Sequence, residues 1–191
     1  MNKTEITYAF IDSQNLNLGL SNDIYKNGKL VYKGWKLDYK KFFIFLKDKW
    51  RVSKAILFIG YIKENEDLYK KLKQFGYEIV FKPTVTDKNG KTKGNVDAEL
   101  VLYSAAKLVD KYNKAIIVSG DGDFHCLYKY LQEKNKLKLI IIPNTKSASS
   151  LLKEFETYKF KVEFENKKLE YRQKNERRNS VTRSYKLVSL S

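Results

Sequence analysis

Five short apolar segments, separated by stretches of helical periodicity, constrain the fold of this chain more than any other feature. The apolar segments are rich in β-branched and aromatic residues, and they span residues 7–11, 54–62, 77–81, 115–118 and 137–142. The stretches that place apolar residues on one helix face span residues 38–50, 64–75, 96–112 and 124–131. Such alternation is typical of parallel strands covered by helices on both faces. We therefore expect an α/β protein, a three-layer α/β/α sandwich with a central, mainly parallel, Rossmann-like sheet of about five strands.

Two connections are longer than this fold requires, and both carry side chains suited to nucleic acid. Residues 20–36 contain three aromatic side chains, and residues 83–95 contain a group of lysines. The aromatic residues are Tyr25, Tyr32 and Trp35, and the lysines of interest are Lys88, Lys91 and Lys93. The lysines are suited to holding phosphates. The aromatic rings are suited either to stacking on bases or simply to packing in the core.

The charge of the chain favours a polyanionic partner. Lys and Arg number 38 against 22 Asp and Glu, which gives a formal net charge of +16. Nucleic acid is the first candidate for such a field. The alternative is that lysine merely covers the solvated surface, because most of the basic residues are lysines.

Several classes of protein are excluded by the same composition. The apolar runs are far shorter than the roughly 20 residues of a membrane span, and the polar N-terminal residues predict no signal peptide. The single cysteine, Cys126, excludes an internal disulfide and a cysteine zinc cluster. We expect a cytoplasmic protein without a membrane partner.

The last part of the chain differs in character from the rest. Residues 161–191 hold four of the five arginines of the chain, including Arg172, Arg177 and Arg178. We predict a catalytic or binding domain over residues 1–160 and a basic extension over 161–191, part helical and part flexible. The alternative is a solvated surface helix without a partner, but the clustered arginines favour nucleic-acid binding by this extension.

Acidic side chains follow two of the predicted strands and open one helix. Asp12 follows the first strand, Asp121 and Asp123 follow the fourth, and Asp97 opens the helix that leads into the fourth. Each acid has a local explanation as a turn or helix cap. The carboxyl ends of parallel strands share one edge, however, so we expect the acids to converge there. A site of oxygen ligands without Cys or His suits Mg²⁺ or Mn²⁺.

These segments together resemble a known family. FIDSQN at 10–15, FIGY at 58–61, KGNVDAEL at 93–100 and SGDGDF at 119–124 are similar to motifs of the NYN domain. This domain is a branch of the PIN-like nuclease superfamily, and the similarity is to its LabA-like group. The resemblance implies a PIN-like fold and divalent-metal-dependent ribonuclease activity. It also implies that Asp12, Asp97, Asp121 and Asp123 are catalytic and metal-binding, with Asn15 and Ser119 as supporting residues.

The resulting hypothesis is a ribonuclease in which metal-activated water attacks an RNA phosphodiester. The flanking phosphates would contact Lys88, Lys91, Lys93, Arg172, Arg177 and Arg178. One rival is an RNA-binding or adaptor protein that keeps the acidic pocket but turns over little. A phosphatase is disfavoured, because Asp12 is followed by Ser13 and Gln14 rather than by a second acid two residues on. The sequence leaves several questions open: whether the substrate is RNA or DNA, whether cleavage is exo or endo, whether one or two metals bind, and whether the chain forms a homodimer or has a protein antidote.

Overall fold

The central sheet has six parallel strands. The structure is a computed structural model that describes residues 5–82, 85–86, 92–93 and 96–173. The strand order is β10-β9-β8-β1-β4-β5, and every neighbouring pair is parallel. The strands are β1 (Thr7–Asp12), β4 (Val52–Gly60), β5 (Glu78–Lys82), β8 (Lys114–Val118), β9 (Leu137–Ile142) and β10 (Lys159–Lys161). The five predicted strands are confirmed, and β10 adds a short edge strand that the sequence did not predict.

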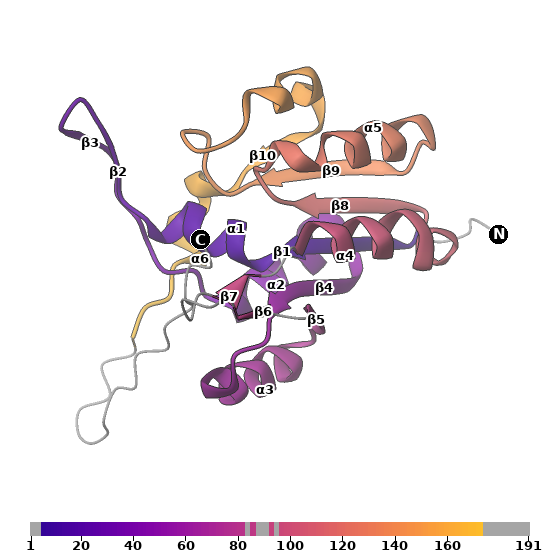
Figure 1. Cartoon of the computed structure of the whole chain (residues 1–191), viewed down its shortest axis with the longest axis horizontal. Helices are drawn as coiled ribbons and strands as arrows, with labels where there is room; N and C mark the ends of the chain where they lie inside the picture. Colours follow the sequence, from indigo (N-terminus) through magenta and orange to yellow (C-terminus); the bar gives the residue numbers. More distant parts are fainter. Residues whose placement is uncertain (1–4, 83–84, 87–91, 94–95, 174–191) are drawn as a thin grey trace.

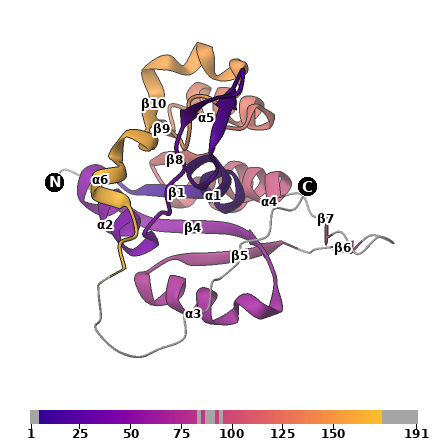
Figure 2. The same cartoon turned by 90° about the vertical axis from the view of Figure 1, so that its left-hand side faces the viewer.

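Helices cover both faces of the sheet, as expected for a three-layer sandwich (Figures 1 and 2). The α-helices are α1 (Ser13–Ser21), α2 (Tyr39–Trp50), α3 (Glu66–Phe75), α4 (Val96–Leu102), α5 (His125–Glu133) and α6 (Asn166–Leu169). The 3₁₀ segments are η1 (Lys63–Asn65), η3 (Val109–Lys111), η4 (Gly122–Phe124), η5 (Ser150–Tyr158) and η6 (Val162–Glu165), and η2 (Tyr103–Lys107) is a π-helical turn. The helix predicted over 96–112 is therefore broken into three short pieces.

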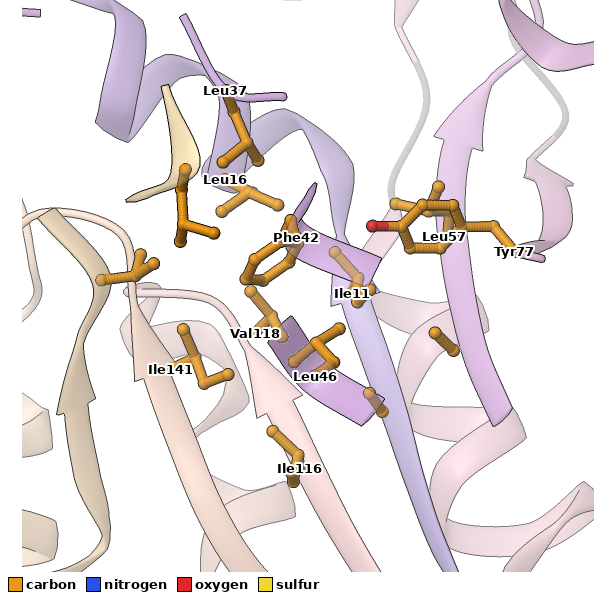
Figure 3. Close-up of a cluster of buried hydrophobic side chains, with 14 of the residues drawn as sticks. Ile11, Leu16, Leu37, Phe42, Leu46, Leu57, Tyr77, Ile116, Val118 and Ile141 are labelled. Carbon is orange, nitrogen blue, oxygen red and sulfur yellow. The ribbon is translucent and has the colours of Figure 1, made fainter. Parts of the chain in front are cut away.

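The core consists of two layers, one on each face of the sheet. Alternate strand residues point to opposite faces, so neighbouring residues such as Phe10 and Ile11 belong to different layers. Figure 3 shows the first layer, in which Ile11, Val118 and Ile141 of the sheet pack against Phe42 and Leu46 of α2. Burial on both faces explains why these strands have nearly continuous apolar sequences.

The strand order reverses next to β1, and this reversal creates a place for a ligand. The chain runs from β1 to β4 and β5 on one side and then crosses to β8 and β9 on the other. In open α/β sheets, ligands bind at the carboxyl ends of the strands where the order reverses. The neighbouring positions of β1 and β8 bring the segments that follow them to one edge of the sheet.

The predicted loop 20–36 contains a β-hairpin instead. Strand β2 (Ile24–Lys26) pairs antiparallel with β3 (Lys29–Tyr32). The turn residues Asn27 and Gly28 both have positive φ, at 51° and 73°. Asn-Gly is the preferred pair for such a two-residue hairpin turn. The hairpin projects beyond the carboxyl edge of the sheet (Figure 1).

The glycine at the base of this hairpin is sterically required. A Cβ atom on Gly34 would lie 2.1 Å from the backbone oxygen of Ser21. We expect Gly34→Ala to lower the free energy of unfolding by about 3 kcal/mol, because backbone must move to relieve the overlap. At Gly28 a Cβ would meet no atom within 4 Å, so Gly28→Ala should cost only about 1 kcal/mol of left-handed backbone strain. Urea unfolding of both variants measures the difference, and equal losses would contradict the steric explanation.

Part of the predicted basic regions lies outside the described residues. Within 83–95 the structure describes only β6 (Val85–Thr86) and β7 (Thr92–Lys93), which pair antiparallel. From the predicted extension, Val162 and Leu169 are buried in the core, and residues 174–191 lie outside the described part. The boundary between domain and extension stays a prediction. No helix among the described residues is both long enough and apolar enough to cross a membrane.

Candidate metal and nucleic-acid site

One pocket at the carboxyl edge of the sheet collects three of the four predicted acids. Its volume is about 630 Å³. Asp12 comes from the end of β1, Asp97 from the first turn of α4, and Asp121 from the segment after β8. The other lining residues are Gln14, Asn15, Leu18, Gly19, Asn22, Asp23, Ile24, Tyr25, Lys82 and Ser147. Residues far apart in the sequence therefore meet at the predicted edge.

Asp12 has both a structural role and an unfavourable electrostatic position. Its Oδ1 accepts hydrogen bonds from the backbone N–H groups of Gln14 (3.1 Å) and Asn15 (3.0 Å), so it caps α1. The residue is only 5% exposed. Burial, with the nearby charges of Asp97 and Asp121, raises the pKa of Asp12 to about 6. The N-cap explanation is thus correct but incomplete, because capping alone would lower this pKa.

A hydrogen-bond network joins the end of β1 to the end of β8. The hydroxyl of Ser119 lies 3.4 Å from Asp12 Oδ2 and accepts from the backbone N–H of Asp121 at 3.1 Å. The side-chain oxygen of Asn15 accepts from the backbone N–H of Gly120 at 2.8 Å. Asn15 lines the pocket, whereas Ser119 is fully buried beneath it. The two predicted supporting residues therefore hold the two acidic segments together.

Asp121 and Asp123 occupy different environments although only Gly122 separates them. Asp121 lines the pocket, and its Oδ1 accepts from the backbone N–H of Asp123 at 3.0 Å, which caps η4. Asp123 is exposed and is not among the pocket-lining residues. Burial first, and then the charges of Asp121 and Asp123, raise the pKa of Asp97. Asp123 thus acts on the pocket through its charge and not by lining it.

Lys82 is a pocket residue that the sequence analysis did not single out. It ends β5, is 3% exposed and lines the pocket. Burial lowers the pKa of Lys82, while Asp12, Asp97 and Glu99 act in the opposite direction. One lysine offsets only part of the charge of three carboxylates. Lys82 directly follows the predicted apolar segment 77–81, which could have identified it. The chain has many other lysines, however, and nothing else in the sequence distinguishes this one.

The donor chemistry of the pocket fits a hard divalent cation. Carboxylate and carboxamide oxygens are the ligands that Mg²⁺ and Mn²⁺ prefer. Burial first, and then the charges of neighbouring carboxylates, raise the pKa values of Asp12 and Asp97, and a cation between the acids would relieve the repulsion among them. As arranged here, no three His, Cys, Asp or Glu side chains of the described residues are placed to hold one ion.

The predicted nucleic-acid contacts are only partly described. Lys88, Lys91, Arg177 and Arg178 lie outside the described residues, as does the side chain of Lys93. Arg172 is exposed, and its Nε lies 3.6 Å from Glu170 Oε2. The role of these residues in binding stays a prediction.

The fold and the pocket together define a class of protein: a Rossmann-like α/β/α sandwich with a carboxylate-lined pocket at the reversal of strand order. The chain belongs to the NYN domain family, whose model matches residues 7–162. It is thus a member of the PIN-like nuclease superfamily. NYN domains are generally nucleases, and nucleases of this type typically use divalent metals.

A solved structure supports the fold. A protein of unknown function from Vibrio parahaemolyticus superposes with a TM-score of 0.61 at 23% sequence identity, over 81% of this chain and 91% of that one. No curated protein matches the chain. The similarity at this identity concerns the fold alone.

Proposed function

We propose that this protein is a divalent-metal-dependent ribonuclease. The observation that carries the proposal is the convergence of Asp12, Asp97 and Asp121 in one pocket at the carboxyl edge of the sheet. Membership of a family of nucleases gives that convergence its chemical interpretation. The net charge of +16 supports a polyanionic substrate.

The side chains of the pocket have distinct roles in this proposal. Asp12, Asp97 and Asp121 would hold Mg²⁺ or Mn²⁺, and Asn15 and Ser119 keep the segments of Asp12 and Asp121 in register. The bound cation would supply a Lewis acid that polarises the scissile phosphate and lowers the pKa of an attacking water. Lys82, which lines the pocket with the acids, would contact a phosphate oxygen of the substrate.

A second function, RNA binding without turnover, is favoured by one observation. The net charge of +16 attracts a polyanion whether or not the pocket cleaves it. A binding protein would hold RNA in the absence of metal and would lose affinity steeply with salt.

Cleavage of a labelled single-stranded RNA in Mn²⁺, Mg²⁺ or EDTA separates the two functions. We expect cleavage with either metal, none in EDTA, and recovery when metal is restored. Asp121→Asn should slow cleavage about a hundredfold or more, because it removes a metal-binding charge. Asparagine keeps the side-chain oxygen that accepts from Asp123, so η4 should stay capped. Binding without cleavage by the parent protein in every metal would instead support the adaptor.

A further inference from the structure

Strand β2 of the β2–β3 hairpin lines the acidic pocket and contributes an aromatic residue to it. Tyr25 lies in β2, is 62% exposed, and lines the same pocket as the three acids. Ile24 and Asp23, which precede it, also line the pocket. The hairpin extends beyond the edge of the sheet where the acids lie (Figure 1). One continuous pocket therefore joins the carboxylates to an accessible aromatic face.

The other two aromatic residues of this segment have structural roles. The hydroxyl of Tyr32 donates to the backbone oxygen of Leu20 at 3.0 Å. Trp35 is buried, and its backbone N–H donates to the same oxygen at 2.8 Å. Both residues fasten the base of the hairpin to the end of α1. Of the three aromatic residues considered from the sequence, Tyr25 alone is exposed at the pocket.

The base of the hairpin is fixed by polar contacts as well. Asp23 Oδ1 accepts from the backbone N–H of Gly34 at 2.8 Å, and its Oδ2 pairs with Lys33 Nζ at 2.7 Å. The Asn27-Gly28 turn closes the other end. An aromatic ring on such a tethered hairpin loses little conformational freedom when a ligand stacks on it.

The charge of the chain suits a nucleic-acid strand. Lys26 and Lys29 are exposed and lie opposite each other in the hairpin register, and because successive strand residues alternate faces they point to the face opposite Tyr25. An accessible aromatic ring on a positively charged protein is the combination by which proteins bind single strands, through base stacking and phosphate contacts. In a duplex both faces of an internal base are covered by its neighbours, so stacking on a side chain requires an unpaired base.

We propose that Tyr25 stacks on an unpaired base close to the phosphate that a cation at the acids would hold, and that this contact selects single-stranded RNA as substrate. The proposal rests on the proposed function for the identity of the ligand. It assigns to the hairpin a base-binding subsite that shares the acidic pocket.

Binding measured apart from cleavage tests this subsite. A fluorescently labelled single-stranded RNA is titrated with protein in EDTA at one fixed salt concentration, and its anisotropy is followed. We expect Tyr25→Ala to weaken binding about tenfold, the size of one lost base–aromatic stack. Tyr25→Phe should bind like the parent, because the ring is kept. Val31→Ala is the matched control, since Val31 is 42% exposed on the same hairpin but is neither the cross-strand partner of Tyr25 nor among the pocket-lining residues.

The outcomes separate this proposal from the proposed function. If Tyr25→Ala alone binds RNA more weakly, the base-binding subsite is supported. This holds even when no variant cleaves RNA, because absence of cleavage would contradict only the proposed nuclease activity. Equal binding by Tyr25→Ala and the parent overturns the subsite even when cleavage is metal-dependent. The same strand annealed to its complement should bind the parent and Tyr25→Ala with equal affinity. If Tyr25→Ala also loses about tenfold in affinity for this duplex, the proposed selection of single strands is overturned. Self-association of the parent that both Tyr25→Ala and Val31→Ala abolish, without loss of RNA binding, would assign the hairpin to a second copy of the chain instead.

Discussion

Asp12→Asn is expected to cleave RNA about a thousandfold more slowly than the parent protein in Mn²⁺, because it removes the most buried carboxylate of the pocket. The fold should survive the change. Asparagine is as good a helix N-cap as aspartate, and its side-chain oxygen can still accept from the N–H groups of Gln14 and Asn15. A large loss of rate would therefore report on the chemistry of the site. The measurement is the initial rate on a labelled RNA at saturating metal.

Asp23→Asn is the matched control for this variant. Asp23 lines the same pocket, but its carboxylate is already paired with Lys33 and with the backbone of Gly34. Asparagine keeps an acceptor for Gly34, and loss of an exposed ion pair costs little. We expect this variant to cleave within a few-fold of the parent rate. Similar rates for Asp12→Asn and the parent would remove the acidic pocket from the mechanism.

The second large effect concerns the dependence of stability on pH in the metal-free protein. The pKa of Asp12 is raised to about 6 from an ordinary value of 3.8. A group with a raised folded-state pKa binds its proton more tightly in the folded state, so stability falls as pH rises through the range from about 4 to 6. Each unit of pKa corresponds to about 1.4 kcal/mol. The free energy of unfolding of Asp12→Asn, relative to that of the parent, should therefore rise by about 3 kcal/mol between about pH 4 and pH 7.

Urea unfolding in EDTA across this pH range measures the gain. Asp23→Asn again provides the comparison, with the opposite sign. The hydrogen bond from Lys33, and then that from Gly34, lower the pKa of Asp23, so its carboxylate stabilises the fold above its ordinary pKa. Asp23→Asn should consequently lose stability relative to the parent as pH rises. A constant difference between Asp12→Asn and the parent at every pH would show that burial and the neighbouring acids do not disfavour the charged form of Asp12.

The sheet and its carboxyl edge were predictable because their signals are local. Apolar runs such as 115–118 identify buried strands, and the position of Asp12 after the first strand places it at the edge whatever the details of packing. The strand order β8-β1-β4 then brings Asp121 next to Asp12. The convergence of Asp12 and Asp121 follows from their positions after two strands and from the neighbouring places of those strands in the sheet.

The hairpin was missed although its turn signal is present. Asn27-Gly28 lies between IYK and KLVY, which is a typical hairpin sequence. The segment was expected to be a loop because its strands are short and exposed, without the apolar character of the central sheet. Accordingly, the three aromatic residues there could not be ranked from the sequence, and only the structure separates exposed Tyr25 from anchored Tyr32 and Trp35.

Two details of the site depend on tertiary structure. Asp121 and Asp123 look equivalent in SGDGDF, but the turn at η4 directs only Asp121 to the pocket. Tyr103, the first residue of η2, packs its ring against Phe58 at a centroid distance of 5.6 Å. This position therefore contributes an aromatic contact to the core.

The central claim is that the acids of the pocket hold a divalent cation, and a crystal structure of the protein soaked in Mn²⁺ tests it most directly. We predict an anomalous difference peak in the pocket, bonded to Asp12 and to at least one of Asp97 and Asp121, which removal of Mn²⁺ by EDTA abolishes. A pocket that stays empty at saturating Mn²⁺, or a peak bonded only to acids elsewhere on the surface, would contradict the account.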